Sequence, residues 1–325
     1  MRSFEEFEHY YNQTLFREME LLDARRKKTQ KRLWSIIALT ALGMAISILL
    51  AAFVIDPARD LHFLLIAVVP LLVLMAGVIA WSTWGRDKNF IADFKREVIE
   101  KIIHFISPEL SYQPTNFIGV DSFERSRLFL TNIDRYHGDD YVFGKIDKTQ
   151  FWFSEIKAEY RTTGSKGETH WQILFKGLFS VADFNKHFEG TTVVLPNRLG
   201  NSAIAKVLQK ANLARREKLV QLEDPEFNKY FVVYGDDQVV SRYVLSTSLM
   251  QRLVDFRKKS DKPIYVSFVN SFMYLAIEYT KDLFEPSMFR SLTKFDTVKP
   301  YFEEIRLATG IVEDLNLNTR IWTKQ

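Results

Sequence analysis

A histidine and two aspartates close together are the residues of this chain best placed to do chemistry. His137, Gly138, Asp139 and Asp140 set an imidazole beside two carboxylates, a combination that can ligate a divalent cation. Glycine and aspartate are also favoured turn residues, so a turn leading into the next strand accounts for the same sequence. We predict the turn, with the cation site as its alternative.

Two further pairs have spacings found in active sites. Asp183 and His187 lie four residues apart, so on a helical turn they could share a hydrogen bond or bridge a metal, but no third ligand accompanies them. Ser154 and Lys157 match the SxxK pattern of serine acyl-enzymes, which requires both side chains on one face of a helix. We predict a strand there, in which positions three apart point to opposite faces.

The remaining sequence patterns exclude several enzyme classes. The HExxH, GxxxxGK[ST] and GxSxG motifs are absent, and residues 164–167 (GSKG) read as a hairpin loop with no helix after it. The chain contains no cysteine, which excludes disulfides, thiolate zinc sites and cysteine nucleophiles. We therefore predict no catalytic residue, no cofactor and no metal ligand.

Charged clusters offer interaction surfaces rather than chemistry. The net charge of +4 is too small to predict a nucleic-acid partner. The clusters are either solvated faces or, for the basic ones, a surface that docks on anionic lipid. The basic clusters are Arg215, Arg216, Lys218, Arg257, Lys258 and Lys259, and the acidic ones are Glu223, Asp224, Asp236 and Asp237.

Two apolar stretches, residues 33–55 and 61–84, contain no Asp, Glu, Lys or Arg. Each exceeds the ~20 residues that cross a bilayer as a helix, so they predict a hairpin of two transmembrane helices. Basic residues gather before the first stretch and after the second, and such residues stay on the cytoplasmic side. The predicted location is therefore a membrane, with the bilayer as a partner and both termini in the cytoplasm.

Small residues within these stretches predict close helix packing. The first stretch carries them at Gly43, Ser47 and Ala51, and the second at Ala76 and Ala80. The spacing leaves open whether the packed helix is the other stretch or a second subunit, as in a homo-oligomer.

Amphipathic helices are predicted on both sides of the apolar stretches. Apolar residues recur every three or four positions over residues 4–22 and again over residues 90–105, where Ser107 and Pro108 follow. The first helix could pack on its own domain, pair with a second copy or lie on a membrane surface. The break-rich residues 107–119 are predicted to be a linker.

Residues 111–325 are predicted to form a cytoplasmic α+β domain, an antiparallel sheet with packed helices. The strand segments are YVFGKI, QFWFSEIKAEY and THWQILFKGLFS as a meander, then TTVVLP, YFVVY, and PIYVSFV paired with FMYLAIEY across Asn270 and Ser271. Helices are predicted at residues 201–218 and 248–256. The other predicted domains are residues 1–32, the hairpin 33–84 and the helix 85–110.

Three blocks of sequence carry a family resemblance. The blocks YHGDDYVFGKIDKTQFWFSEI, LFKGLFSVADFNKHFEGTTVVLP and EDPEFNKYFVVYGDDQVVSRYVLS, placed after two apolar stretches, resemble the bacterial membrane proteins of the domain of unknown function family 3137. The resemblance covers residues 1 to about 280. It implies a location in the bacterial cytoplasmic membrane and no catalytic residue.

The sequence thus favours an accessory or scaffold protein whose globular domain binds a protein or lipid. Two alternatives stay open. One is a membrane-tethered enzyme whose polar site includes His137, and the other is a structural subunit of a membrane complex.

Overall fold

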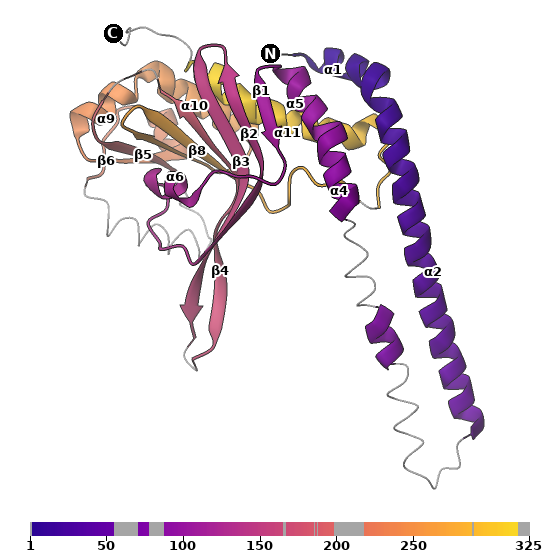
Figure 1. Cartoon of the computed structure of the whole chain (residues 1–325). Coiled ribbons are helices and arrows are strands. Elements are labelled where there is room, and N and C mark those ends of the chain that lie inside the picture. The colour runs from indigo at the N-terminus through magenta and orange to yellow at the C-terminus, as the bar shows by residue number, and fades with distance from the viewer. Residues whose placement is uncertain are drawn as a thin grey trace. The chain divides into compact units, whose positions relative to one another are not determined.

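The computed structural model divides the chain into two compact units (Figure 1). The sheet unit comprises Met1–Ser3, Glu100–Phe284 and Pro300–Gln325, and the helical unit comprises Phe4–Ile99 and Glu285–Lys299. The structure describes residues 2–54, 71–77, 88–164, 167–184, 186, 188–197, 218–287 and 289–317.

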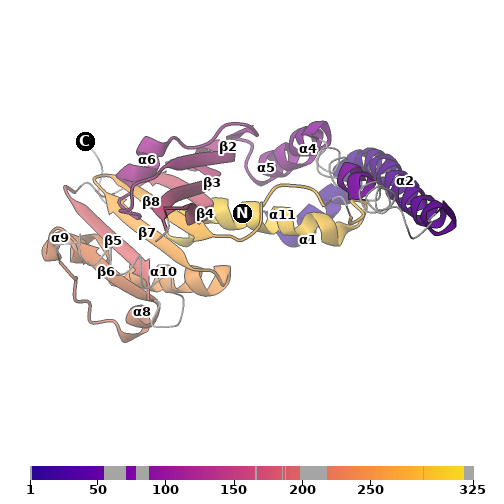
Figure 2. The same ribbon diagram turned by 90° about the horizontal axis from the view of Figure 1, so that it is seen from below.

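An eight-stranded sheet in the order β1-β2-β3-β4-β8-β7-β5-β6 forms the centre of the sheet unit (Figure 2). All the neighbouring strands pair antiparallel, which confirms the predicted sheet and each of its predicted strands. The strands are β1 (Leu110–Gln113), β2 (Arg135–Ile146), β3 (Thr149–Thr163), β4 (Thr169–Asp183), β5 (Thr191–Pro196), β6 (Phe231–Gly235), β7 (Ile264–Val269) and β8 (Phe272–Glu278).

One prediction about the connections between strands is wrong, and another falls on residues that the structure does not describe. The segment 107–119, predicted to be a linker, contains β1, which pairs with β2 from Leu110 opposite Gly144 to Gln113 opposite Tyr141. Its break-rich composition concealed a strand of only four residues. The helix predicted at residues 201–218 falls almost entirely outside the described residues.

Two residues with unusual backbone angles shape β8 and its neighbours. The predicted β7–β8 hairpin is confirmed, and Asn270 makes its turn with a left-handed φ of 53°. Gly177, with φ of 150°, lies where β8 begins to pair with β4. A Cβ atom there would lie 2.1 Å from the Ile277 carbonyl oxygen, so only glycine allows this approach.

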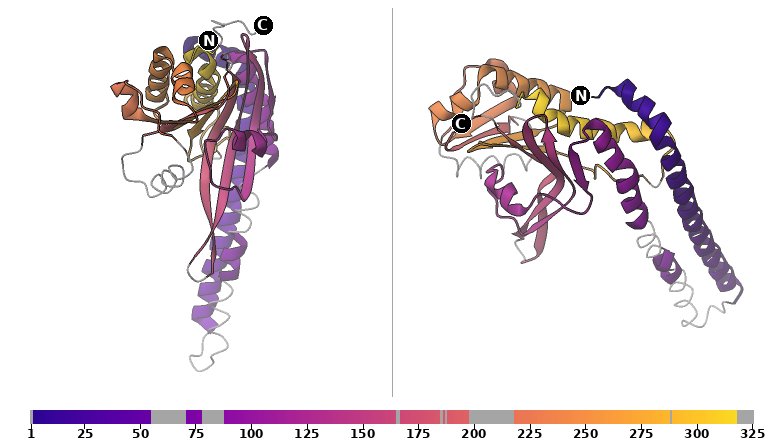
Figure 3. Two further views of the ribbon diagram at one scale, coloured as in Figure 1. Left: turned by 90° about the vertical axis from the view of Figure 1, so that its left-hand side faces the viewer. Right: turned by 45° about the horizontal axis from the view of Figure 1, so that its top comes forward.

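Helices flank the sheet on its two sides, with α10 (Thr247–Ser260) and α11 (Phe295–Asp314) on one and α6 (Val120–Arg125) on the other (Figures 1 and 3). The first five residues of α11 belong to the helical unit. Helix α10 confirms the predicted helix at residues 248–256. The remaining helices described in the sheet unit are α5 (Glu100–Ile106), α8 (Pro225–Tyr230) and α9 (Gln238–Val244).

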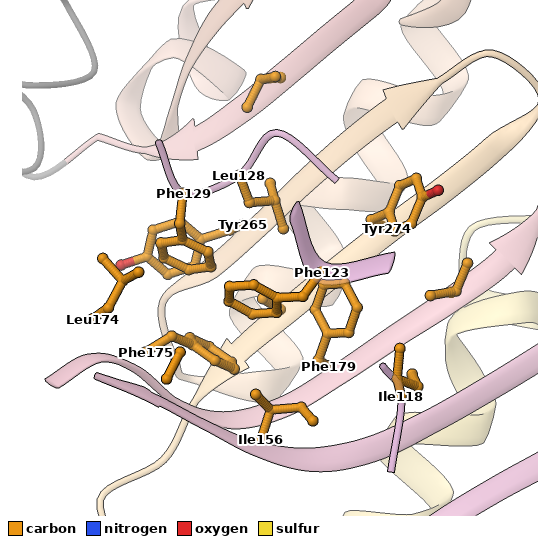
Figure 4. Packing of buried hydrophobic residues seen from close by; sticks show 14 residues of the cluster. Ile118, Phe123, Leu128, Phe129, Ile156, Leu174, Phe175, Phe179, Tyr265 and Tyr274 are labelled. Carbon is orange, nitrogen blue, oxygen red and sulfur yellow. The ribbon is translucent and has the colours of Figure 1, made fainter. Parts of the chain in front are cut away.

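Aromatic rings form the core beneath α6 (Figure 4). Phe123 of α6 is fully buried and its ring centroid lies 5.0 Å from that of Phe179 and 5.8 Å from that of Phe175, both on β4. Phe129 stacks on Phe123 at 5.2 Å and also contacts Tyr265 of β7. These contacts attach the short segment around α6 to the middle of the sheet.

The helical unit begins with α1 (Phe4–Tyr10), the π-helical turn η1 (Tyr11–Leu15) and the long helix α2 (Phe16–Val54). Its later helical elements are residues 71–77, α4 (Lys88–Phe94) and the π-helical turn η2 (Lys95–Ile99). The apolar stripe predicted over residues 4–22 is confirmed, and the Tyr11 ring packs 5.3 Å from the Phe295 ring. The stripe therefore packs within its own unit.

A buried ion pair fixes α2 to the segment that precedes α11. Asp23 accepts hydrogen bonds from Arg26 Nε at 2.8 Å and from the Leu292 backbone N–H at 3.0 Å, and Lys27 Nζ lies 3.0 Å away. Burial alone would raise the pKa of Asp23, but these donors outweigh it and hold the pKa below its ordinary value. The carboxylate is thus charged and paired inside the unit.

The predicted hairpin of two transmembrane helices is wrong. Among the residues that the structure describes, no helix is both long enough and apolar enough to cross a membrane. Residues 33–54 are not a separate helix but the second half of α2, whose first half carries the basic residues. Of the second stretch, only residues 71–77 and no other part of 61–84 are described, about 10 Å of helix against ~30 Å of hydrocarbon.

Helix α2 and residues 71–77 nevertheless face each other. A Cβ atom on Gly43 would lie 3.8 Å from the Val73 side chain, and one on Gly77 would lie 3.3 Å from Thr40. Gly43, predicted to lie in a packing stripe, therefore faces the other apolar segment of its own chain. The side chains of Ser47, Ala51 and Ala80 lie outside the described residues, and the inner-membrane location stays a prediction.

Candidate functional site

Three carboxylates meet at a bulge in β2. The pairing of β2 with β3 shifts between Asp139 and Val142, and Asp140 takes a left-handed φ of 59°. A bulge inserts an extra residue and re-aims its side chain. Oxygen atoms of Asp139, Asp140 and Glu155 consequently lie within 4.8 Å of one another. The turn predicted at residues 137–140 is wrong, because these residues lie inside β2.

Two groups from outside β2 and β3 hold this carboxylate cluster. The Tyr112 hydroxyl of β1 donates a hydrogen bond to Asp140, whose side chain is only 1% exposed. The backbone N–H of Leu283, after β8, donates to Glu155 Oε2 at 2.9 Å. The cluster therefore connects the bulge to the chain that leaves β8.

Burial and like charge act together on Glu155. Desolvation raises the pKa of Glu155 to about 8, with further increases from the negative charges of Asp139, Asp140 and Asp282, while the hydrogen bond from Leu283 lowers it. Burial and the Asp140 charge also raise the pKa of Tyr112, which stays protonated. At neutral pH Glu155 therefore carries a proton, which relieves the repulsion between the carboxylates.

Chemically, the carboxylate cluster offers oxygen ligands of the kind that hard cations prefer. Within the described part of the chain it is the only group of three such side chains. The proton on Glu155 already reduces the negative charge of the carboxylate cluster. His137, predicted as a companion ligand, is exposed and lies outside the carboxylate cluster. The geometry thus supports a buried proton-holding cluster rather than a histidine–carboxylate centre.

Sequence reasoning missed Glu155, although a signal was present. In a strand, alternate residues share a face, and Phe151, Phe153 and Glu155 are all buried on one face of β3. An acidic residue that continues an aromatic stripe points into the core, where it needs a partner.

Of the other predicted sites, the described residues test the Ser154–Lys157 pair. The Ser154 hydroxyl is buried and accepts a hydrogen bond from the Ile118 N–H at 3.0 Å, whereas Lys157 pairs with Glu159 at 2.7 Å. This confirms that the SxxK residues do not face each other. Asp183 ends β4, and His187 lies outside the described residues, as do Ser165 and Lys166 of the GSKG loop.

Several residues of the charged clusters bond to other groups within the fold. Asp224 and Asp237 cap α8 and α9, each accepting two backbone N–H groups. Lys258 pairs with Glu226 at 2.6 Å and Lys259 with Asp314 at 2.5 Å. Arg215 and Arg216 lie outside the described residues.

The far end of the β3–β4 hairpin forms a second feature, a ribbon that extends beyond the neighbouring strands (Figure 1). We call residues 159–163 and 169–173 the β-ribbon. Strand β2 pairs with β3 only as far as Glu159, and β8 pairs with β4 only from Gly177 onward. Beyond Glu159, no other described strand borders the β-ribbon, so its far end extends past the sheet.

Exposed apolar side chains lie on this β-ribbon. Trp171 is 38% and Ile173 48% exposed, and both share one face of β4. The Arg135 guanidinium carbon lies 3.5 Å from the centroid of the Trp171 ring, a cation–π contact. Arg161 stands directly opposite Trp171 on β3. Sequence reasoning placed these residues in a meander but did not single them out.

Comparison with known proteins gives a family match over less than half of the chain. No curated protein matches the chain. Among solved structures, the crystal structure of the mycobacterial trehalose monomycolate transport factor A, TtfA, aligns with 66% of this chain and 93% of its own, at 10% sequence identity and a TM-score of 0.31. A family model described as "Protein of unknown function (DUF3137)" matches residues 173–317. Over those residues the chain matches the DUF3137 family model, the family that the sequence resemblance indicated.

Proposed function

We propose that this protein is a non-enzymatic accessory or scaffold protein that binds a protein partner through the β-ribbon. The observation that carries the proposal is the exposure of Trp171 and Ile173 on a ribbon whose neighbours end before it does. Tryptophan is among the residues most often found at the energetic centre of protein interfaces.

The chemistry of the carboxylate cluster favours this proposal over the enzymatic alternative. General acid–base catalysis needs a group within reach of a substrate, whereas Asp140 and Glu155 are 1% and 6% exposed. Their hydrogen bonds go to Tyr112 and to the Leu283 N–H, so both carboxylates are used within the fold. The exposed surface available to a partner is instead the β-ribbon.

Replacing Trp171 and Ile173 together with serine is expected to reduce partner capture at least ~10-fold, because each buried anchor contributes ~1 to 2 kcal/mol at an interface. Full-length protein would be immobilised, exposed to lysate of the source cells and analysed by quantitative mass spectrometry of proteins and lipids. Both side chains are already exposed, so the thermal unfolding temperature should change little.

The matched control replaces Val239 and Tyr243 of α9, which are 75% and 47% exposed, with serine. Proteins that are retained by wild type and by this control, but lost by the β-ribbon variant, would support the proposal. Equal capture by all three chains would overturn it, as would loss of a lipid alone.

A further inference from the structure

We propose that the partner contributes an extended acidic segment that pairs with the outer edge of β4, residues 169–173, as an additional antiparallel or parallel strand. This inference rests on the proposed function and specifies its chemistry. It follows from the hydrogen-bond register of the β-ribbon and from the charges beside Trp171.

The register shows which backbone groups of β4 face outward. The Gly164 N–H donates to the Glu168 carbonyl at 2.8 Å, so this pair is hydrogen-bonded across the hairpin. Bonded and non-bonded pairs alternate in an antiparallel ladder, which makes Thr169 and Trp171 non-bonded partners of β3. Their N–H and C=O groups, and those of Ile173 two residues on, therefore point away from β3.

The opposite edge of the β-ribbon is already closed. The Asp134 N–H donates to the Glu159 carbonyl at 2.9 Å, and Asp134 Oδ2 accepts from the Arg161 N–H at 2.7 Å. On β4, by contrast, no described strand pairs with residues 169–173 on the outer side. The open edge is thus a single, defined row of donors and acceptors, the kind that strand addition uses.

Length limits the added strand. Opposite Ala158 and Glu159, β4 carries an extra residue at Leu174, and this bulge interrupts the edge. The available edge is therefore residues 169–173, about 17 Å long at ~3.4 Å per residue. Two-stranded ribbons are only marginally stable in water, so a third strand here would stabilise the β-ribbon.

Charge indicates the chemistry of the added strand. Arg135 and Arg161 form no ion pair with a carboxylate of the described residues, and the Arg135 charge lies over Trp171 on β4 itself. One nearby acid is already compensated, since Glu159 pairs with Lys157 at 2.7 Å. An incoming strand with carboxylates beside Trp171 would neutralise the two guanidinium groups.

The first test changes only the edge. Thr169→Pro removes one outward N–H and no bond to β3, while Thr169→Val keeps that N–H and serves as the control. For partners whose capture depends on the β-ribbon, the proline variant should reduce capture ~10-fold, and the valine variant should leave it unchanged. Ribbon-dependent capture that Thr169→Pro leaves unchanged would overturn strand addition while leaving the proposed function intact.

The second test selects peptides on the wild-type protein. A phage-displayed library of random octapeptides, selected on the full-length protein, should yield acidic, proline-free sequences rich in β-branched residues. N-methylation of alternate residues on one edge of a selected peptide should abolish binding, and on the other edge should not. Selection of basic peptides, no enrichment at all, equal effects of both N-methylation patterns, or unchanged binding to Arg135→Gln would each overturn the inference.

Discussion

Replacing Glu155 with glutamine is expected to stabilise the sheet unit at about pH 9 by a few kcal/mol, while changing its stability little at about pH 4. The reason is the buried carboxyl, whose pKa is raised from 4.5 to about 8 by desolvation and by the neighbouring carboxylates. Glutamine is the neutral isostere of the protonated acid and can still accept the hydrogen bond from Leu283.

The direction of this pH effect depends on how many protons the folded and the unfolded chain bind. Between pH 4.5 and about 8 the unfolded chain loses the Glu155 proton while the folded chain keeps it. The folded state then binds more protons, so the free energy of unfolding falls as the pH rises through this window and levels off above it. The glutamine variant lacks this dependence, because it has no proton to lose.

Urea denaturation at a series of pH values, followed by circular dichroism, measures the effect. The control is Glu168→Gln, an exposed glutamate in the loop after β3, which should follow the wild-type pH dependence. A difference between Glu155→Gln and wild type that stays constant from pH 4.5 to 8 would show that Glu155 does not hold a proton in the fold.

The carboxylate cluster was not predictable from the sequence, although the strands around it were. Strands β3, β7 and β8 were predictable because they are rich in aromatic and β-branched residues. The bulge at Asp139 and Asp140 was not, since it arises from a register shift between two strands that the sequence of one strand does not encode. Once the register is known, the same two aspartates change from turn residues into neighbours of Glu155.

The β-ribbon was missed for a related reason. Its strands were predicted, but their free ends depend on how far β2 and β8 extend alongside them. Strand β4 has 15 residues and its neighbour β8 has 7. Only this difference in length indicates that one end of β4 extends past its neighbour. Pairing partners depend on topology, and local periodicity reports only the strand itself.

The apolar stretches misled the sequence analysis in the opposite direction. Lack of charge over residues 33–55 predicted a separate membrane span, yet α2 runs from Phe16 to Val54 as one helix that includes the basic residues. Periodicity was the more reliable signal here, because the stripe over residues 4–22 is buried as predicted. Burial against a partner segment leaves a repeating pattern, whereas low charge alone does not identify the surroundings.

Replacing Phe123 with alanine is expected to destabilise the sheet unit by ~3 to 5 kcal/mol, the usual cost of removing a fully buried phenylalanine. Phe123 belongs to α6, which has only six residues and gains little from its own helical hydrogen bonds. Its ring packs against four aromatic side chains, so alanine would leave a cavity in the centre of this cluster. The four are Phe129, Tyr136, Phe175 and Phe179, of which Figure 4 labels Phe129, Phe175 and Phe179.

The matched control is Phe117→Ala, since Phe117 is 38% exposed and its ring approaches that of Tyr136 at 5.8 Å. It should cost less than ~1 kcal/mol in urea denaturation. Hydrogen exchange gives an independent readout, because the Ile118 N–H donates to Ser154 and the Ile118 carbonyl accepts from Tyr136. Loss of Phe123 should accelerate exchange at Ile118 while β7 and β8 stay protected; equal costs for both variants would show that the α6 segment is not held by its aromatic contacts.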